Sequence, residues 1–377
     1  MRLSDIWRGN GHDADFVTLD APEASYLTLC KGKVAALGKF GGPVASEKKL
    51  SFPERFGYSP QMVPWLRANV PSYDAVIVHA LWNYATIAAG QVLVGGNTPY
   101  FVFPHGSLDP WFKRAYRHKH LAKVVLWPFT EGRLMNNATS VLFTTEEERV
   151  LATNVYRPWN VRSDIVGFGS SDVSGDSDAQ QKAFRQLLPA LGDRKFLLFL
   201  SRIHHKKGCD LLIRAFARIA ADHPDHDLVM AGPDQTGWQA ELEAIAAELG
   251  VSSRIHWPGM IKGDAKWGAF RACEAFALTS HTENFGIVVA EALACSKPVL
   301  ITDKVNLWRE VAGDGAGMIE TDTQTGADTL VRNFLALDDA ERQAMGARGR
   351  VCFEKHFRME SAAENILSVM RARGVPA

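Results

Sequence analysis

The chain has 377 residues, of which 46% are hydrophobic and 22% charged, the ordinary composition of a soluble globular protein. This length exceeds what one hydrophobic core usually holds and predicts two domains. Basic and acidic residues number 42 each, so the sequence carries no overall positive charge of the kind that favours nucleic-acid binding.

Five cysteines lie far apart and include no C-x-x-C spacing. Their odd number and their separation argue against a zinc site or a disulfide framework and favour the reducing cytoplasm. No apolar run approaches the roughly 20 residues that span a bilayer, and the start of the chain lacks the apolar centre of a signal peptide. We therefore expect a cytoplasmic protein, with the inner face of the plasma membrane as the alternative location.

Short apolar runs that end in polar or glycine-rich turns predict the strands. They occupy residues 16–19, 75–78, 100–103 and 140–143 in the first half, and residues 196–200, 228–231, 254–257, 275–278 and 298–301 in the second. Each run is unbroken rather than alternating, which is typical of strands buried on both faces. Helical patterns between them, at 210–222, 237–249 and 287–294 among others, predict parallel sheets with crossover helices.

The two ends of the chain carry further helical patterns. Residues 4–10 read as the end of a helix that precedes the strand at 16–19, and residues 338–373 read as helical. A doubly wound domain usually begins with a strand and a glycine-rich turn before its first helix. The first domain is therefore expected to lack its first strand.

A stretch of small and polar residues at 167–181 predicts the boundary between two domains. The first domain is expected at 1–170 and the second at 182–355, and each has the usual size of a domain. Residues 356–377 are expected to form a C-terminal helix that packs back on the first domain. The predicted fold class is α/β, with two Rossmann-like domains.

A basic turn follows the predicted strand at 196–200, at the end of the strand where ligands bind in such sheets. Arg202 offers a planar fork of N–H donors and Lys207 a compact charge, a pair suited to the oxygens of a diphosphate. Gly208 allows a tight backbone at the start of the next helix. Taken alone, a solvated basic loop explains the same residues equally well.

A second polar segment, residues 279–291, follows the predicted strand at 275–278. Gly286 lies at the start of a helix whose free N–H groups can receive phosphate or hydroxyl oxygens. Glu283 precedes this helix, and Glu291 lies inside it among apolar residues, where an unpaired carboxylate would be costly. Vicinal sugar hydroxyls are suitable partners for Glu291, and an internal salt bridge is the simpler alternative.

The two segments end neighbouring strands of one domain, so they can face one ligand. Cations for a diphosphate and carboxylates for hydroxyls together describe a nucleotide sugar. These segments resemble the retaining GT-B glycosyltransferases of family 4, the glycosyltransferase group 1 class. The residues that match its Arg…Lys-Gly turn and its Glu-x-Phe-Gly-x-x-x-x-Glu motif are Arg202, Lys207, Gly208, Glu283, Phe285, Gly286 and Glu291. The resemblance extends in outline over residues 74–357.

The resemblance implies a GT-B architecture, in which two Rossmann-like domains face each other across a cleft. It also implies roles for the matching residues. Arg202 and Lys207 would stabilise the leaving diphosphate. Glu283 would hold hydroxyls of the transferred sugar, assisted by the backbone from Asn284 to Gly286.

Further roles follow from the same resemblance. Glu291 would bind the ribose, and Gly259 and Met260 would border the base. The family retains the anomeric configuration of the sugar, through an oxocarbenium-like state. It normally needs neither a metal ion nor another cofactor.

The predicted strand at 100–103 ends at a His-Gly turn. The resemblance places such a turn opposite the donor sugar, so His105 is expected to position the sugar and to polarise the reaction. Asp109 and Trp111 are candidates for contact with the acceptor, and so is His79 at the end of the strand at 75–78. A lone histidine is more often structural, and this alternative weighs most heavily for His79.

Residues 113–127 are basic, aromatic and partly amphipathic. A solvated helix face is the simpler interpretation of this segment. The alternative is peripheral contact with an anionic membrane, beside a lipid-linked acceptor. That alternative suits a family many of whose members build bacterial surface glycans.

The expected function is retaining transfer of a hexose from a nucleotide diphosphate sugar to a glycan or lipid-linked acceptor, in bacterial exopolysaccharide or lipopolysaccharide biosynthesis. A nucleotide-sugar epimerase of related architecture and an inactive carbohydrate-binding relative remain as alternatives. A glycosidase is disfavoured, because Glu283 and Glu291 lie on one side beside cations and do not flank a bond. The sequence leaves the donor base, the donor sugar and the acceptor open.

Overall fold

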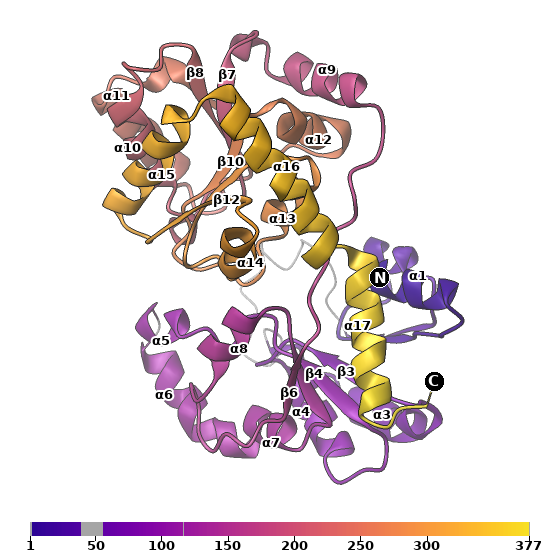
Figure 1. The fold of residues 1–377 in the computed structure, drawn as a ribbon. Coiled ribbons are helices and arrows are strands. Elements are labelled where there is room, and N and C mark those ends of the chain that lie inside the picture. The colour runs from indigo at the N-terminus through magenta and orange to yellow at the C-terminus, as the bar shows by residue number, and fades with distance from the viewer. Residues whose placement is uncertain (1, 39–55, 116, 377) are drawn as a thin grey trace. The chain divides into compact units, whose positions relative to one another are not determined.

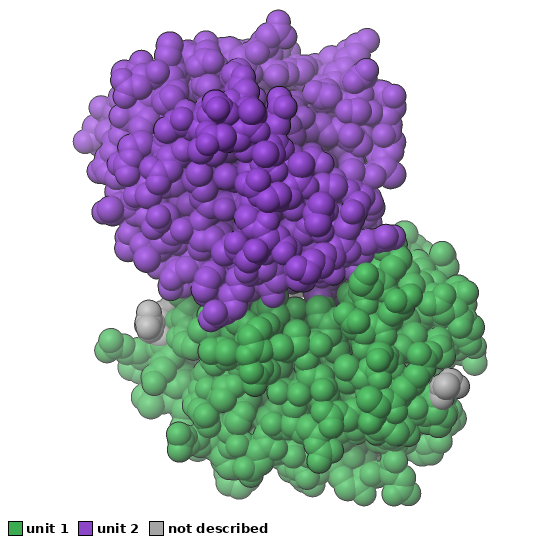
Figure 2. Space-filling model, in the orientation of Figure 1, with its two compact units in different colours: residues 1–167, 359–377 green, residues 168–358 purple. Residues whose placement is uncertain are grey.

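The computed structural model describes residues 2–38, 56–115 and 117–376, and the chain divides into two compact units. Unit 1 comprises Met1–Gly167 and Met359–Ala377, and unit 2 comprises Phe168–Arg358 (Figures 1 and 2). The observed division therefore falls at 167–168, the start of the predicted boundary segment, and again at 358–359. No described helix combines the length and the apolar composition that crossing a bilayer requires.

Unit 2 is built on a six-stranded parallel sheet with the order β12-β11-β10-β7-β8-β9. Its strands are β7 (Lys195–Leu200), β8 (His226–Ala231), β9 (Ile255–Gly259), β10 (Ala275–Leu278), β11 (Val299–Thr302) and β12 (Gly317–Glu320). Numbered from β7, this order is that of a Rossmann fold, and the chain reverses direction along the sheet between β7 and β10. Ligands of such sheets bind at this reversal, beyond the carboxyl ends of the strands.

Eight α-helices accompany the strands of unit 2. They are α9 (Ser177–Leu187), α10 (Cys209–Ile219), α11 (Gln239–Glu248), α12 (Gly263–Ala272), α13 (Ile287–Ala294), α14 (Trp308–Gly313), α15 (Gln324–Ala336) and α16 (Asp339–His356). Of these, α10 to α14 connect successive strands, α9 precedes β7, and α15 and α16 follow β12. The strands β8, β10 and β11 are buried along their whole length, which confirms the prediction from their unbroken apolar runs. Helix α13 is also buried, so the apolar residues around Glu291 are explained by core packing.

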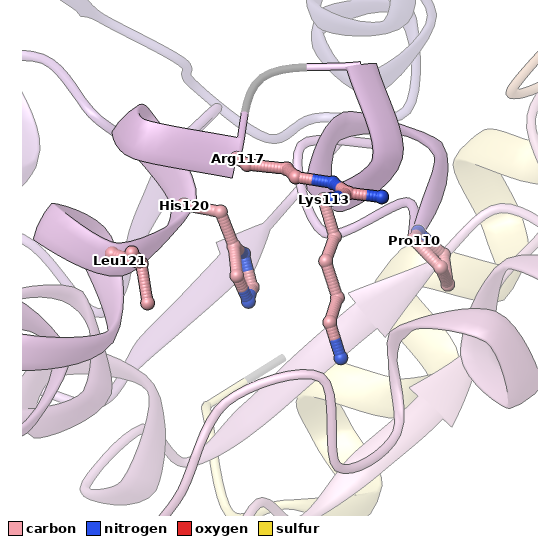
Figure 3. Close-up of a pocket in the computed structure, with 5 residues that line it drawn as sticks. All are labelled: Pro110, Lys113, Arg117, His120 and Leu121. Carbon is pink, nitrogen blue, oxygen red and sulfur yellow. The ribbon is translucent and has the colours of Figure 1, made fainter.

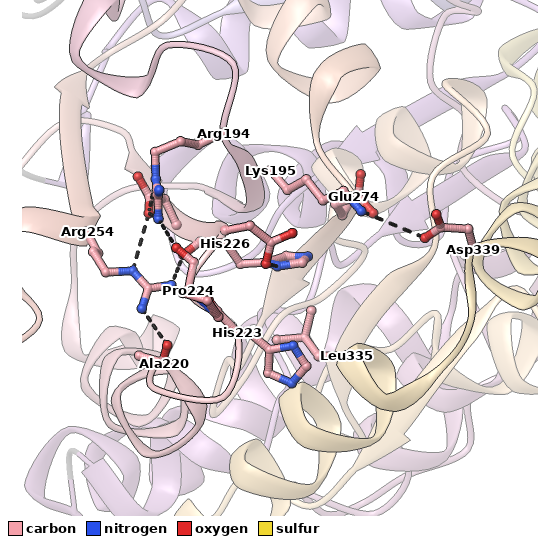
Figure 4. Close-up of polar contacts among 12 residues, drawn as sticks. Arg194, Lys195, Ala220, His223, Pro224, His226, Arg254, Glu274, Leu335 and Asp339 are labelled. Carbon is pink, nitrogen blue, oxygen red and sulfur yellow. Dashed lines mark hydrogen bonds and ion pairs between the residues drawn. The ribbon is translucent and has the colours of Figure 1, made fainter.

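Two arginines hold the turn between α10 and β8. Arg254 donates from Nη1 to the carbonyl oxygen of Ala220 at 2.5 Å, and Arg194 donates from Nη2 to that of Pro224 at 2.6 Å (Figure 4). Arg194 also donates from Nε to the buried carboxylate of Asp227 at 2.9 Å. Burial alone would raise the pKa of Asp227, but hydrogen bonds from its partners outweigh this effect and lower it. Arg194 and Arg254, which hold this turn, therefore have structural roles.

Unit 1 contains a four-stranded parallel sheet with the order β3-β4-β5-β6. Its strands are β3 (Val76–His79), β4 (Tyr100–Phe103), β5 (Ser140–Phe143) and β6 (Ser163–Ile165). Its helices are α1 (Arg2–Gly9), α3 (Met62–Asn69), α4 (Tyr84–Leu93), α5 (Trp111–Ala115), α6 (Arg117–Leu126), α7 (Glu131–Asn136), α8 (Glu146–Ala152) and α17 (Met359–Ala372).

The start of the chain forms a separate small sheet within unit 1. Helix α1 precedes strand β1 (Phe16–Thr18), as predicted, and β1 pairs in parallel with β2 (Val34–Ala36). Among the described residues neither strand joins the four-stranded sheet. Strand β2 was not predicted, because its three half-buried residues make too short an apolar run.

The predicted helical tail is two helices, which separate at residues 357–358. Helix α16 belongs to unit 2, whereas α17 belongs to unit 1 and lies beside α1 (Figure 1). Trp7 donates its indole N–H to the carbonyl oxygen of Ala363 at 3.0 Å, and Ile366 packs in the core with Phe101 and Phe103. These contacts return the end of the chain to the sheet of unit 1.

Candidate functional site

The turns that follow β7 and β10 are joined by hydrogen bonds. The backbone N–H of His281 donates to the carbonyl oxygen of Lys206, and the hydroxyl of Thr279 donates to that of Gly208, both at 2.8 Å. Gly208 has a φ of +58°, and a Cβ there would lie 2.2 Å from the Thr279 carbonyl oxygen. Only glycine therefore allows the two turns to approach this closely.

Lys207 and Glu283 form an ion pair across these two turns. The Lys207 side chain is 7% exposed and that of Glu283 is 21% exposed. A lysine this deeply buried requires a partner, because an unpaired charge away from water is costly. The structure therefore brings together Lys207, predicted to bind the diphosphate, and Glu283, predicted to bind the sugar, at the reversal point of the sheet.

A third segment, which follows β11, holds Glu283 in place. The backbone N–H of Glu283 donates to the carbonyl oxygen of Lys304 at 2.9 Å, and that of Asn306 donates to the Glu283 carbonyl oxygen at 3.0 Å. Asn306 is 3% exposed, and its Oδ1 has no hydrogen-bond partner among the described protein atoms. The Oδ1 of Asn284 also lacks one. Asn306 was not predicted, because the only feature of the sequence that indicates a role for it is its position just after a buried strand.

Gly286 begins α13 in the left-handed conformation, with a φ of +72°. A Cβ at this position would lie 3.2 Å from both Cγ of Glu283 and Cγ1 of Val305. Phe285 is buried and packs edge-on against the rings of Phe168 and Phe357. The aromatic residue of the motif thus anchors the loop, and the glycine leaves room for the Glu283 side chain.

Glu291 forms an ion pair with Lys266 of α12, with a distance of 2.5 Å from Nζ to Oε1. Its other oxygen, Oε2, is buried and has no protein partner within the described chain. The structure therefore contains the internal salt bridge that the sequence left as the simpler alternative, and it leaves one carboxylate oxygen for a hydroxyl donor. Lys266 was not foreseen, because it lies 25 residues away on a different helix.

Arg202 lies on the turn after β7, and Gly259 and Met260 lie at the end of β9. Arg202 is exposed and donates from Nη1 to Oε1 of Gln235 at 3.1 Å. Gly259 accepts a hydrogen bond from the backbone N–H of Gly232 at 2.8 Å, and Met260 is exposed. A Cβ on Gly232 would overlap the carbonyl oxygen of Ser201. The ends of β7, β8 and β9 therefore lie close together.

In unit 1, His79 and His105 are in contact at the ends of β3 and β4. Nδ1 of His79 lies 2.9 Å from Nε2 of His105, and the rings stack with centroids 5.2 Å apart. Removal from bulk water lowers the pKa of His105 to about 4, and that of His79 to about 3 with the charge of a protonated His105 as a second cause. His79 keeps an exposed edge, and because both pKa values are lowered, both rings are neutral near pH 7.

The His105 turn is held by a buried glutamate that the sequence analysis did not single out. Oε1 of Glu148 accepts the backbone N–H of Gly106 at 2.7 Å, and its Oε2 accepts the backbone N–H and the hydroxyl of Thr144. His105 itself has a φ of +49°, which is uncommon for a residue with a side chain. Glu148 thus stabilises the turn by accepting the N–H of Gly106 and links it to Thr144.

Replacing Glu148 with alanine is expected to lower the free energy of unfolding by about 2–3 kcal/mol, because buried donors lose their acceptor. It should also reduce turnover about tenfold by releasing His105. Urea unfolding and the chemical shifts of the His105 ring check these effects. The matched variant Glu147→Ala removes the same charge next to it and should leave both unchanged. An unmoved His105 resonance in Glu148→Ala would contradict the positioning role.

The remaining first-half candidates lie on the short segment after His105. Oδ1 of Asp109 accepts the backbone N–H of Trp111 at 2.7 Å, so this carboxylate caps the first turn of α5. Both side chains are half-exposed. Within the segment 113–127, residue 116 lies outside the described residues. The described helix α6 in this segment has no buried residue.

Two α/β units, one of them with the strand order of a Rossmann fold and polar groups at its reversal point, place the chain in the class of two-domain α/β proteins with Rossmann-like sheets. The family model described as glycosyl transferases group 1 matches residues 180–351, and the glycosyl transferase 4-like domain matches residues 1–169. The chain therefore belongs to the group 1 glycosyltransferases, with GT-B architecture.

Similar proteins agree with this assignment. The D-inositol 3-phosphate glycosyltransferases of Stackebrandtia nassauensis and Frankia alni are 28% and 30% identical over 259 residues, which cover 64% and 66% of this chain. The chain spans only 56% and 62% of the length of these two relatives.

Solved structures share the fold over almost the whole chain. Sucrose-phosphate synthase of Thermosynechococcus elongatus matches with a TM-score of 0.74 and 19% identity, covering 98% of this chain and 91% of that one. Anabaena Alr3699/HepE, solved with UDP and glucose, matches with a TM-score of 0.73 and 17% identity, covering 98% and 95%.

Proposed function

We propose that this protein transfers a sugar from a nucleoside diphosphate sugar to an acceptor. The observation that carries the proposal is the Lys207–Glu283 pair, which lies where the carboxyl ends of β7 and β10 diverge. Cleavage of the bond from the anomeric carbon to the phosphate oxygen leaves the electron pair on the diphosphate. A fixed cation aimed at this developing charge lowers the barrier, and Lys207 is such a cation, with Arg202 on the same turn.

The remaining assignments of the proposal follow the chemistry of each group. Glu283 accepts hydroxyl hydrogens of the transferred sugar, and the free Oε2 of Glu291 accepts those of the ribose. Gly259 and Met260 border the base. His105, neutral near pH 7, contacts the sugar as a hydrogen-bond donor or acceptor rather than as a fixed charge.

The finer proposal is retaining transfer of a hexose to a glycan or lipid-linked acceptor in the assembly of bacterial surface polysaccharide. It is supported by similarity to WaaG, a glycosyltransferase involved in lipopolysaccharide biosynthesis, with a TM-score of 0.67 and 16% identity, over 98% of this chain and 94% of that one. No metal ion or other cofactor takes part in the proposed reaction.

A thermal-shift screen of nucleotide sugars tests the proposal directly. A donor at about 100 times its dissociation constant should stabilise the protein by roughly 2.7 kcal/mol. The donor found in this way is then incubated with the wild type and with Glu283→Ala, and the release of nucleotide is followed. Equal release by both proteins would refute the site. Release of free nucleotide with a rearranged sugar, independent of any acceptor, would instead identify an epimerase.

We also propose that α6 and the residues after it contact an anionic membrane. Leu121 and Val125 are 63% and 69% exposed on α6, which also carries lysines and an arginine, and Phe129, just after α6, is 77% exposed. Apolar side chains that insert beside basic ones are typical of interfacial helices. Val125→Glu should abolish sedimentation with phosphatidylglycerol vesicles, and retained sedimentation would contradict the contact.

A further inference from the structure

A cavity of about 530 Å³ opens in unit 1 between α5 and α6. It is lined by Pro110, Lys113, Arg117, His120 and Leu121. Figure 3 shows the side chains of Lys113, Arg117 and His120 around the same space, although they come from two helices. Every polar side chain of the lining is basic or carries imidazole nitrogens, so the cavity suits an anion rather than a cation.

Among the described residues, no ion pair neutralises the positive charges that line this pocket. Within the described part of the chain, neither Lys113 nor Arg117 forms an ion pair. Partial burial lowers the pKa of His120, and the charges of Lys113 and Lys123 lower it further. Cations that repel one another in this way are costly unless an anion joins them. The arrangement therefore favours a bound anion.

A second feature beside the pocket points to a ligand. His120 packs against the ring of Tyr156, and Tyr156 packs against Trp82, with centroids 5.1 Å and 5.4 Å apart. Trp82 has a φ of +67°, and its indole N–H is buried without an acceptor among the described protein atoms. A bulky residue held in the left-handed region marks stored strain, which concentrates at functional sites.

The pocket and the aromatic residues together describe a phosphorylated sugar. A guanidinium binds two phosphate oxygens as a fork, and an ammonium adds a compact charge. The half-buried Trp82 has an indole N–H without a described protein acceptor, which can donate to a hydroxyl of the attached sugar. A membrane surface would need outward charges only, whereas a hollow with cations around it recognises a discrete anionic group.

We propose that this pocket binds a phosphate or diphosphate group carried by the acceptor, with Trp82 beside the adjoining sugar. This inference rests on the proposed function, because it names the chemical class of the acceptor. The D-inositol 3-phosphate glycosyltransferases among the similar proteins are named for an acceptor with a phosphate group, which is consistent with it. The acceptor can be soluble or linked to a lipid, and the experiment separates these two sources.

The test is a calorimetric titration of the full-length protein with inorganic pyrophosphate. We expect two classes of site, one at Lys207 and one in the pocket. The double variant Lys113→Ala, Arg117→Ala should lose the pocket class, with at least a tenfold increase in its dissociation constant for each cation removed, or about 1.4 kcal/mol per tenfold. Lys119→Ala removes one positive charge from α6 outside the pocket lining and should retain both classes.

The donor site is followed separately, so that the two proposals can fail independently. Arg202→Ala should weaken the first class and leave the pocket class unchanged. If the double variant binds pyrophosphate like the wild type, the pocket proposal is overturned, while the donor site stands. If no pyrophosphate binds at Lys207, the proposed function fails instead.

The source of the phosphate is decided with vesicles. Phosphatidylcholine vesicles with and without a polyprenyl diphosphate are sedimented with the wild type and with the double variant. Binding that requires the polyprenyl diphosphate and is lost in the double variant identifies a lipid-linked acceptor. Pyrophosphate binding without any preference for these vesicles identifies a soluble one. Both proteins are also sedimented with phosphatidylglycerol vesicles. If the double variant loses binding only to these vesicles and still binds pyrophosphate, the pocket is a membrane contact and the proposal is overturned.

Discussion

Replacing Lys207 with methionine is expected to lower donor turnover by about 10²–10³-fold. Removing one preorganised group that stabilises developing charge has an effect of this size in other enzymes. Lys207 is buried and faces Glu283, so no water or neighbouring side chain can replace its charge at the same position. Turnover is measured as nucleotide release with the donor identified by thermal shift.

The same variant needs a control for folding, because it leaves the carboxylate of Glu283 half-buried without its partner. The double variant Lys207→Met, Glu283→Gln removes both charges and keeps their shape, and its stability should be close to that of the wild type. It should nevertheless be as inactive as the single variant. Lys206→Met removes the neighbouring charge and should retain most activity. An active double variant would contradict the assignment of both residues.

Replacing Gly208 with alanine is expected to lower the free energy of unfolding by about 2–5 kcal/mol and to abolish donor binding. About 1–2 kcal/mol arise from the left-handed backbone, and a further 1–3 kcal/mol from overpacking. The overlap is with the Thr279 carbonyl oxygen, which lies 2.2 Å from the added Cβ. Relief of this contact would separate the turns after β7 and β10, and with them Lys207 and Glu283.

Gly250 provides the matched control for this substitution. It also has a positive φ, of +71°, but no atom lies within 4 Å of an added Cβ. Gly250→Ala should therefore show the backbone cost alone and bind donor normally. Urea unfolding measures both variants, and donor binding follows from thermal shift. Equal stabilities for Gly208→Ala and Gly250→Ala would show that the close approach of the two turns is not what requires glycine.

The central strands of both sheets were predictable because they are buried on both faces. Strands β4, β5 and β10 occupy the residues predicted for them, and α13 begins and ends as expected. Strands β6 and β12 lie at the edges of their sheets and are only half-buried. Edge strands need fewer apolar residues, so the apolar runs that reveal central strands do not reveal these two.

The residues of the candidate site also fall into those that local sequence motifs predict and those that they do not. Arg202, Lys207, Glu283 and Glu291 could be selected in advance, because local motifs place polar side chains directly after buried strands or on a buried helix. Lys266, Asn306 and Glu148 could not, since no local pattern separates them from ordinary polar residues. Each acts through a partner on a different element, and each was found only from its hydrogen bonds or its burial.

The sequence by itself determined which residues end the central strands and which chemical groups follow them, because burial and backbone conformation depend on local patterns of apolar residues and glycine. Only the tertiary structure decided how these groups combine. Lys207 meets Glu283 across 76 residues because β10 lies beside β7, and Glu291 of α13 meets Lys266 of α12 across 25 residues. Strand order and helix packing are set by the burial of whole surfaces, which no single segment encodes.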